Sequence, residues 1–297
     1  MRWAQIFSRT ETMAKMSVSR WIFCALLLTV ATSGLSIAEE DGGKIVGGQF
    51  AYRGQFPWMA VITSEINGTV QLYCGGSMIS GDYVITAAQC VPPENDYTAK
   101  IRIVLGVHNV SATTEIGRVD LIADYHFVHP DYNAATLANN IAIVHLPTRV
   151  SSSPYVKESQ LPYASEWNAT YLGIRTRVSG WGADRDNGLS NHSDVLRYVD
   201  NNVQDLQVCQ DYYALTGFEV NENHICISTE GGRGPCFGDV GSPLTLTETS
   251  SDAHQIGLFS FGDKTYCTRG RPVVYTKFAS YWDFITDYTG IRPQAEL

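Results

Sequence analysis

The sequence contains no cluster of lysine and arginine residues, and its 21 basic residues are outnumbered by 30 acidic ones. A formal net charge of −9 argues against nucleic acids and anionic membrane surfaces as partners. The chain has no internal repeat, no low-complexity tract and no CxxC pair, and the last absence argues against a structural zinc site. With 44% hydrophobic residues in 297, the composition indicates one compact globular unit or two closely packed ones.

Residues 1–38 have the features of a secretory signal peptide. Arg20 precedes an apolar run from Trp21 to Val30, and Ser36-Ile37-Ala38 supplies small residues for cleavage. A membrane span needs about 20 apolar residues, so the run is short for a signal anchor, which is the alternative interpretation. Met16 is a second candidate for the start of the chain. We therefore expect a secreted, extracellular protein with no membrane attachment after the signal peptide is removed.

The cysteine content agrees with an oxidising compartment. Cys24 lies in the predicted signal peptide, and the other six cysteines are Cys74, Cys90, Cys209, Cys226, Cys236 and Cys267. An even number favours three disulfides, although six cysteines allow 15 pairings and spacing does not select among them. Secretion also makes candidate glycosylation sites of the Asn-X-Ser/Thr sequons at Asn67, Asn109, Asn168 and Asn191.

After Lys44, short runs rich in β-branched and aromatic residues alternate with loops rich in Asn, Asp, Gly, Ser and Pro. Examples of these runs are Trp58–Thr63, Tyr83–Ala88, Ile101–Val107, Ile141–Leu146, Leu172–Ser179, Gln255–Phe261 and Pro272–Phe278. Many short strands at this spacing predict an all-β barrel or sandwich. A polar stretch, Ser151–Ser165, separates two halves of similar size. Apolar residues at helical spacing in Ser280–Tyr288, followed by Gly290, predict a short C-terminal helix.

Three motifs, far apart in the chain, have the form of a catalytic site whose reactive residues have been replaced. Residues 86–90 read TAAQC, residues 140–142 read NIA and residues 238–243 read GDVGSP. The trypsin-like serine proteases carry TAAHC, an aspartate at the start of the second motif, and GDSGGP. Gln89, Asn140 and Val240 therefore stand at the positions of the base, the acid and the nucleophile, in the chymotrypsin order.

The chain resembles the trypsin-like serine proteases from Ile45 to about Gly290, and within them the secreted homologs that have lost catalysis. Further motifs occur in the expected order: Ile45-Val46-Gly47-Gly48, Phe56-Pro57-Trp58, Cys74-Gly75-Gly76-Ser77 and Ser179-Gly180-Trp181-Gly182. The resemblance implies two six-stranded antiparallel β-barrels with the cleft between them. It also implies the disulfides Cys74–Cys90, Cys209–Cys226 and Cys236–Cys267.

The resemblance also implies how the chain is divided. Residues 1–38 would be the signal peptide and residues 39–44 a short propeptide. A trypsin-like domain would occupy residues 45–290, with the seam between its barrels near residues 151–165. Residues 291–297 would form a tail.

The replacements remove the chemistry that the resemblance would otherwise imply. Val240 has no atom that can attack a carbonyl carbon. Gln89 has no pKa in the useful range and cannot relay a proton. Two amides at Gln89 and Asn140 could instead hydrogen-bond to each other without charge. Ser242 lies beyond the tight turn that presents a nucleophile, and no histidine adjoins it, so we expect no substitute catalysis. For the seven histidines we expect surface or loop positions, and for His145 a structural one in an apolar strand.

Parts of the activation and metal-binding apparatus can be read in the same way. Lys44–Ile45 is a candidate cleavage site, and the resemblance implies that Asp239 pairs with the amine freed at Ile45. The alternative is that this arrangement persists only as part of the fold. The backbone N–H groups of Gly238 and Val240 could still form an anion-binding nest. Val107 replaces an acidic calcium ligand of the family, so we expect no metal and no cofactor.

The cleft is expected to have an uncharged, narrowed specificity pocket. By resemblance, Gly234 lies at the pocket base, Phe237 at its rim and Val273 at a wall position that is often glycine. Ser260-Phe261-Gly262 matches the edge strand that pairs with an extended peptide by β-augmentation. A small apolar side chain could be held there without being cut, and the alternative is a partly collapsed cleft that binds nothing.

These observations predict a secreted, catalytically inactive serine protease homolog that acts by protein binding. Its role would be that of a regulator or cofactor in extracellular proteolysis or innate immunity. Its partner would be an extracellular protein: a protease, a protease inhibitor or a cascade component. The alternatives are an active serine endopeptidase, a non-cleaving decoy for protease inhibitors, and a bulk component of a secreted fluid. The absence of a clip-like cysteine module before Ile45 argues against one subgroup of cascade cofactors.

Overall fold

The computed structural model describes residues 45–66, 69–93, 98–183, 192–247, 254–263, 265–267 and 269–295. The predicted signal peptide, the propeptide with Lys44, and the sequons at Asn67 and Asn191 lie outside these residues. Of the two units into which the chain divides, Met1–Asp41 is outside them entirely, so the description concerns Gly42–Leu297. Of the other sequons, Asn168 is exposed in a turn, and Asn109 accepts a hydrogen bond from the Ser111 N–H.

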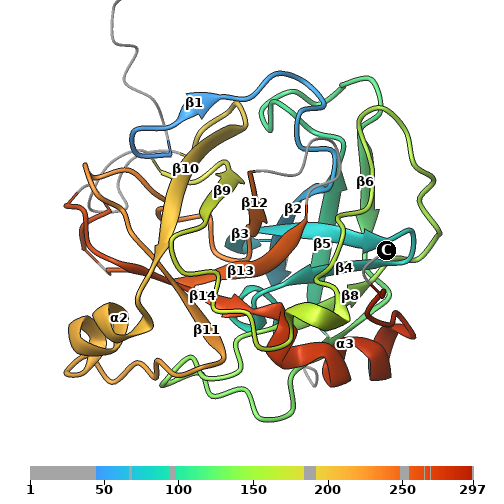
Figure 1. The fold of residues 1–297 in the computed structure, drawn as a ribbon. Helices are drawn as coiled ribbons and strands as arrows, with labels where there is room; N and C mark the ends of the chain where they lie inside the picture. The colour runs from blue at the N-terminus through green and yellow to red at the C-terminus, as the bar shows by residue number, and fades with distance from the viewer. Residues whose placement is uncertain are drawn as a thin grey trace, which may run out of the picture. The chain divides into compact units, whose positions relative to one another are not determined.

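Seven strands form the first antiparallel sheet, in the order β6-β5-β2-β3-β4-β8-β7 (Figure 1). They are β2 (Met59–Ile66), β3 (Thr69–Ser80), β4 (Tyr83–Thr86), β5 (Ala99–Leu105), β6 (Val119–Ile122), β7 (Tyr125–Val128) and β8 (Ala142–His145). The sheet curls because its two edge strands follow each other in the chain. Ala123 N–H donates to Ile101 of β5, and Asp124 N–H to His145 of β8. If β6 and β7 are counted as one bent strand, the sheet has six strands, the number that the resemblance implies.

The second sheet closes on itself. Its strands are β1 (Gln49–Phe50), β9 (Arg175–Gly180), β10 (Arg197–Gln204), β11 (His224–Ile227), β12 (Pro243–Leu246), β13 (Gln255–Phe261) and β14 (Val273–Lys277). The order is β1-β10-β11-β14-β13-β12-β9, and an additional pairing of β9 with β10 closes six strands into a barrel. The short strand β1 adds to the edge of β10. The all-β architecture predicted from the sequence is confirmed.

Helices are few and short in the described residues. The 3₁₀ helices are η1 (Ala88–Cys90), η2 (Ala164–Glu166) and η3 (Phe278–Tyr281). The C-terminal helix α3 (Trp282–Thr289) confirms the prediction, and Gly290 ends it with a φ of +73°, a conformation that glycine adopts without strain. The helix α2 (Leu206–Tyr213) was not predicted, although the Asp205 side chain accepts the Gln207 N–H at its start. No helix among the described residues has the length and apolar character to cross a membrane.

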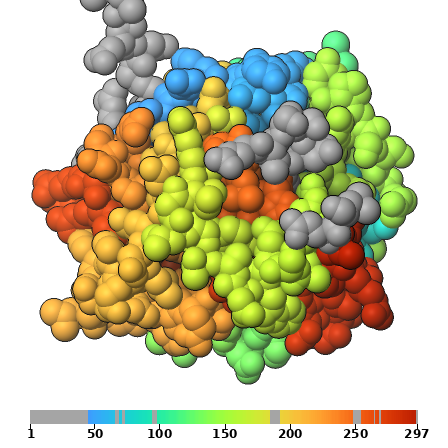
Figure 2. Space-filling model, in the orientation of Figure 1, coloured from blue at the N-terminus to red at the C-terminus, as the bar shows by residue number. Residues whose placement is uncertain are grey.

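The stretch predicted to be the seam runs over the surface between β8 and β9, in yellow-green in Figure 2. It contacts the first sheet before the second. Ser159 N–H donates to the carbonyl of Met78 in β3 at 2.8 Å, and Gln255 N–H in β13 donates to the carbonyl of Gln160 at 2.7 Å. The segment thus crosses from one barrel to the other through backbone hydrogen bonds.

Each barrel has its own apolar core, and Val240 packs against both. Strand residues Ile62, Ile85 and Ile143 belong to the first core, whereas Val178 and Tyr275 belong to the second; all are buried. Fully burying a side chain of this size stabilises the fold by about 1.5–3 kcal/mol. Val240 therefore lies where the two cores meet.

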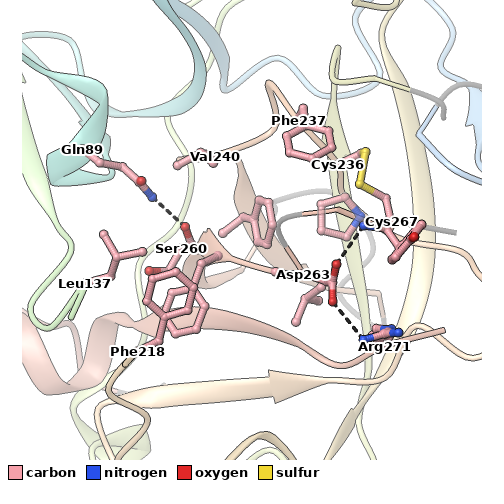
Figure 3. A pocket seen from close by; sticks show the side chains of 16 residues that line it. Gln89, Leu137, Phe218, Cys236, Phe237, Val240, Ser260, Asp263, Cys267 and Arg271 are labelled. Carbon is pink, nitrogen blue, oxygen red and sulfur yellow. Dashed lines mark hydrogen bonds and ion pairs between the residues drawn. A yellow bond between two sulfur atoms is a disulfide. The ribbon is translucent and has the colours of Figure 1, made fainter. Parts of the chain in front are cut away.

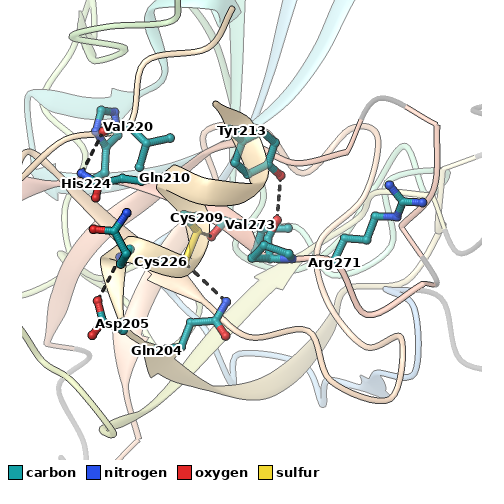
Figure 4. Close-up of a disulfide and its surroundings, with 12 residues drawn as sticks. Gln204, Asp205, Cys209, Gln210, Tyr213, Val220, His224, Cys226, Arg271 and Val273 are labelled. Atoms are coloured by element: carbon teal, nitrogen blue, oxygen red, sulfur yellow. Dashed lines mark hydrogen bonds between the residues drawn. A yellow bond between two sulfur atoms is a disulfide. The ribbon is translucent and has the colours of Figure 1, made fainter. Parts of the chain in front are cut away.

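Three disulfides bind the loops to these barrels. They join Cys74 to Cys90, Cys209 to Cys226 and Cys236 to Cys267, the three pairs that the resemblance implies. Figure 4 shows the second of them between α2 and β11. A disulfide typically contributes about 2–4 kcal/mol. The first one fixes η1, and with it Gln89, against β3.

We predict that His224 makes the protein sensitive to mild acid. His224 is buried in β11, and burial lowers its pKa from 6.5 to about 4. Because the unfolded chain takes up the proton first, the stabilising contribution of neutral His224 is present above pH 6.5 and lost as the pH falls towards 4. The difference amounts to at most about 3 kcal/mol.

The measurement is the free energy of unfolding in denaturant at a series of pH values between 7 and 4. His224→Gln should have a flatter profile than the unsubstituted protein, because glutamine does not titrate. His126→Gln, at a partly exposed ring in β7, is the control and should keep the original slope. An unchanged slope in His224→Gln would show that other groups cause the acid sensitivity.

Candidate functional site

The three positions that resemble a replaced catalytic triad come from three separate elements and meet where the barrels join. Gln89 lies in η1, directly after β4; Asn140 lies in the turn before β8; and Val240 lies in the loop before β12. Gln89 and Val240 line one cavity, in which Figure 3 shows their side chains as neighbours. Asn140 has no exposed surface. The framework of the catalytic site is therefore present, with an amide, a second amide and a hydrocarbon at its three positions.

Asn140 connects the two barrels through hydrogen bonds. Its Oδ1 accepts the Gln89 backbone N–H at 3.1 Å, and its Nδ2 donates to Ser260 Oγ at 2.9 Å. Its backbone carbonyl accepts the hydroxyl of Thr276, in β14, at 3.1 Å. The amide satisfies a donor and an acceptor without placing a charge in the interior. We refer to Gln89, Asn140 and Ser260 as the amide clasp.

The Gln89 side chain does not pair with the Asn140 side chain, as the sequence had led us to consider. Its Nε2 donates to the backbone carbonyl of Ser260 at 2.7 Å (Figure 3), and only its backbone N–H contacts Asn140. The reason lies in β13, whose register against β14 shifts between Phe259 and Phe261. The carbonyl of Ser260 is thereby left outside the ladder and available to Gln89.

The turn that would present a nucleophile is retained around Val240. The Val240 carbonyl accepts the Gly75 N–H at 2.8 Å. Gly241 has a φ of +82°, and a Cβ there would overlap Thr86 Oγ1 and the Gly75 carbonyl. Ser242 is fully buried and packs against Gly75, so its hydroxyl does not face the cavity. The Ser242 hydroxyl thus lies in the interior, on the side of the turn that packs against Gly75.

Two of the seven histidines, His224 and His254, are buried and so differ from the surface or loop positions expected for them. His145 lies in strand β8 as expected, and its Nδ1 lies 3.5 Å from a carboxylate oxygen of Asp124. His192 lies near the site: its ring stacks on Tyr73, with centroids 4.3 Å apart, and a Cβ on Gly238 would overlap it. Burial lowers the pKa of His192.

No hydrogen bond joins His192 to Gln89 or Val240 in the described part of the chain. The sequence carries no signal for the position of His192, because this residue belongs to a loop without periodicity.

Asp239 is a fully buried carboxylate, and its hydrogen bonds among the described residues come from backbone N–H groups. Its Oδ1 accepts the Gly182 N–H at 2.7 Å and its Oδ2 accepts the Cys236 N–H at 2.9 Å. Burial raises its pKa from 3.8 to about 7. Among the described residues, no cationic side chain lies within ion-pair distance of it. The buried carboxylate is therefore suited to a cation that the described residues do not supply.

The candidate cleavage segment is already packed against the second barrel. Ile45 is fully buried in the core of that barrel, and Val46 pairs with Gly234 in an isolated bridge. Ile45 has a φ of +46°, which is unfavourable for a β-branched residue. Lys44 itself lies outside the described residues.

A cavity of about 210 Å³ opens beside the amide clasp, and its lining includes Phe237, Ser260, Phe261, Gly262 and Val273. Val273 packs closely against Gly262, since its Cγ1 would lie 3.0 Å from a Cβ built on that glycine. Gly234, in contrast, does not line this cavity; a Cβ there would lie 2.7 Å from Thr229 Cγ2.

Charge in the cavity comes from a pair that the sequence did not reveal. Arg271 and Asp263 both line it and form an ion pair at 3.1 Å, to which Tyr212 donates its hydroxyl (Figure 3 shows the pair). The pair is neutral as a whole, so the cavity offers mainly apolar surface. No sequence motif placed these two residues beside the cleft.

In the loop that resembles a calcium site, the guanidinium group of an arginine lies beside the carboxylate that could otherwise bind a metal ion. Val107 is buried against Trp58 and Trp181. Glu115 accepts the His108 N–H at 2.9 Å and pairs with the guanidinium of Arg53 at 2.6 Å. The one carboxylate that these contacts bring into the loop is thus already neutralised, and the described residues contain no group of three metal-ligating side chains.

Comparison with known proteins agrees with this geometry. The family model described as Trypsin matches residues 45–285. The chain belongs to the trypsin family. Brachyurin of Leptuca pugilator is 33% identical over 251 residues, which cover 84% of this chain and 100% of that protein. Collagenase of Hypoderma lineatum is 32% identical over 256 residues, covering 86% and 91%. A solved structure of HL collagenase superimposes with a TM-score of 0.72 at 29% identity, covering 84% of this chain and 100% of that one.

Proposed function

We propose that this trypsin-family chain is a secreted, catalytically inactive protein that acts by binding an extracellular partner. The observation that carries the proposal is the amide clasp beside Val240. Gln89 and Asn140 occupy the base and acid positions as hydrogen-bonded amides, and a valine occupies the position of the nucleophile. Peptide hydrolysis by this fold requires a hydroxyl, an imidazole and a carboxylate in contact. None of the three groups is present at its position.

Neighbouring side chains do not supply the missing groups. The hydroxyl of Ser260 accepts a hydrogen bond from Asn140 and is buried, and that of Ser242 packs into the interior. Relatives such as brachyurin, whose names are those of proteases, favour an active endopeptidase by analogy. A shared fold does not determine function, and the residues of the site weigh more than the analogy.

The biological setting that we propose is extracellular proteolysis or innate immunity. Relatives include phenoloxidase-activating factor 3 of Holotrichia diomphalia, at 31% identity, and proclotting enzyme of Tachypleus tridentatus, at 29%. These names suggest cascades of extracellular proteases. Three disulfides fit an extracellular protein. A regulator or cofactor that binds a protease, an inhibitor or another cascade component agrees with all of these observations.

We predict that protein cleaved after Lys44 neither hydrolyses peptides nor reacts with a fluorophosphonate probe. Val240→Ser alone should restore at most a trace of labelling, because Gln89 cannot take the proton from the hydroxyl. The matched positive control is the triple variant Val240→Ser, Gln89→His, Asn140→Asp, which should label. Stoichiometric labelling of the unsubstituted protein, absent from a denatured sample, would contradict the proposal.

A second prediction concerns Asp239 as the receiver of the new N-terminus. Cleavage before Ile45 creates an amine that can pair with the buried carboxylate, so the cleaved form should present a surface that the intact form lacks. Affinity capture from the native extracellular fluid should therefore yield a partner with cleaved protein but not with intact protein. Cleaved Asp239→Asn should lose the partner.

The control for this capture is Asp124→Asn, which changes a carboxylate on the surface of the first barrel and should leave it unaffected. Equal capture by intact, cleaved and Asp239→Asn protein would place the binding surface away from the activation region. Failure of every form to retain a partner would contradict the regulatory role.

A further inference from the structure

The strand β13 has a free edge where it passes the cavity. Its ladder with β12 ends at the pair Pro243–Leu258, and its ladder with β14 is interrupted between Phe259 and Phe261. From Ser260 onward the strand therefore has an edge without a neighbouring strand among the described residues. Such an edge is where an extended peptide can add as a further strand, through hydrogen bonds between the two backbones.

Gln89 occupies the first acceptor on this edge. It reaches Ser260 from η1, on the other side of the cavity, and its Nε2 donates to the Ser260 carbonyl at 2.7 Å (Figure 3). A side-chain amide N–H and a backbone N–H are the same kind of donor. A carbonyl oxygen can accept two hydrogen bonds, but Gln89 lines the same cavity as Ser260, so its amide takes up the side from which an added strand would bring its own N–H.

The backbone of Gln89 is fixed in place, whereas its side-chain amide can move out of the cavity. Its backbone N–H is bonded to Asn140, and the next residue forms the disulfide with Cys74. The side chain itself is only partly buried. It can therefore rotate out of the cavity without disturbing the amide clasp's buried bond between Asn140 and Ser260 Oγ.

We propose that Gln89 is a gate on a peptide-binding edge: its amide imitates the backbone N–H of a bound peptide and keeps the edge closed until a segment displaces it. The proposal rests on the proposed binding function. The occupant is an extended loop of a partner protein that carries an apolar side chain, because Phe237, Val240, Phe261 and Val273 line the adjoining cavity.

The expected size of the effect follows from exchanging one neutral hydrogen bond for another. Removing the competing amide should tighten the binding of such a loop by about threefold to tenfold. The gain should depend on the peptide's own N–H group. A peptide in which that nitrogen is methylated cannot donate, and it should bind weakly whether or not Gln89 is present.

The test uses the full chain and disulfide-closed synthetic peptides that present one extended loop with a central leucine. Dissociation constants are measured by calorimetry for the unsubstituted protein, Gln89→Ala and Gln89→Met. Methionine keeps the bulk of glutamine but has no donor, so both variants should gain affinity. The matched control is Gln207→Ala, which removes an exposed amide that donates to Asp211 on α2. Its affinity for the peptides should not change.

The outcomes separate the gate from simpler explanations. Affinity gained in both Gln89 variants for the leucine peptide, and lost when the leucine nitrogen is methylated, supports the gate. A gain in Gln89→Ala alone, or an equal gain with the methylated peptide, would show that Gln89 merely fills space, and no gain would overturn the proposal. Mass spectrometry of the peptides after each titration identifies cleavage, which would refute the proposed function and not the gate.

Discussion

Asn140 lies without exposed surface at the junction of the two barrels, and its side-chain amide holds residues of both. It accepts a hydrogen bond from the first barrel through the Gln89 backbone and donates one to Ser260 in the second. Each buried polar group left without its hydrogen-bond partner lowers the free energy of unfolding by about 1–3 kcal/mol. A neutral amide makes both hydrogen bonds without the free-energy cost of burying a charge. A carboxylate at this position would carry that cost, and only a cationic partner would offset it. The geometry of the cleft depends on this contact.

The positions that resemble a catalytic triad thus carry side chains that pack and form hydrogen bonds. Val240 joins the two apolar cores, and the Gln89 amide satisfies a carbonyl that the bulge in β13 leaves unpaired. Asp239 retains two backbone hydrogen bonds, and its raised pKa is the consequence of burying a carboxylate that has no cationic partner among the described residues. A binding protein can use such a framework because it needs a shaped surface and no proton transfer.

The sequence predicted the parts of this structure that motifs and periodicity determine. The run Gln255–Phe261 is strand β13 to the residue, and the apolar spacing before Gly290 predicted α3. The disulfide pairs followed from the family resemblance, since spacing alone allowed 15 arrangements. Strand β10 was missed because its Asp200, Asn201 and Asn202 disfavour a strand locally, and the ladder with β9 overrides that preference.

Features that depend on tertiary contacts could not be predicted. The choice of Gln89 between Asn140 and the Ser260 carbonyl is decided by a bulge in a strand 171 residues away along the chain. The position of His192 on Gly238 is set by a loop, and the pairing of Arg53 with Glu115 joins residues 62 apart. The replaced triad was visible at once in the sequence, whereas the contacts that now satisfy it were not.

The most direct test of this account is a double-mutant cycle on the contact between Asn140 and Ser260, read as free energies of unfolding. Asn140→Ala, Ser260→Ala and the double variant are compared with the unsubstituted protein in denaturant. A structural clasp predicts that each single change is destabilising and that the pair is coupled by about 1 kcal/mol. Additive effects, with coupling near zero, would show that the replaced catalytic positions do not hold the barrels together.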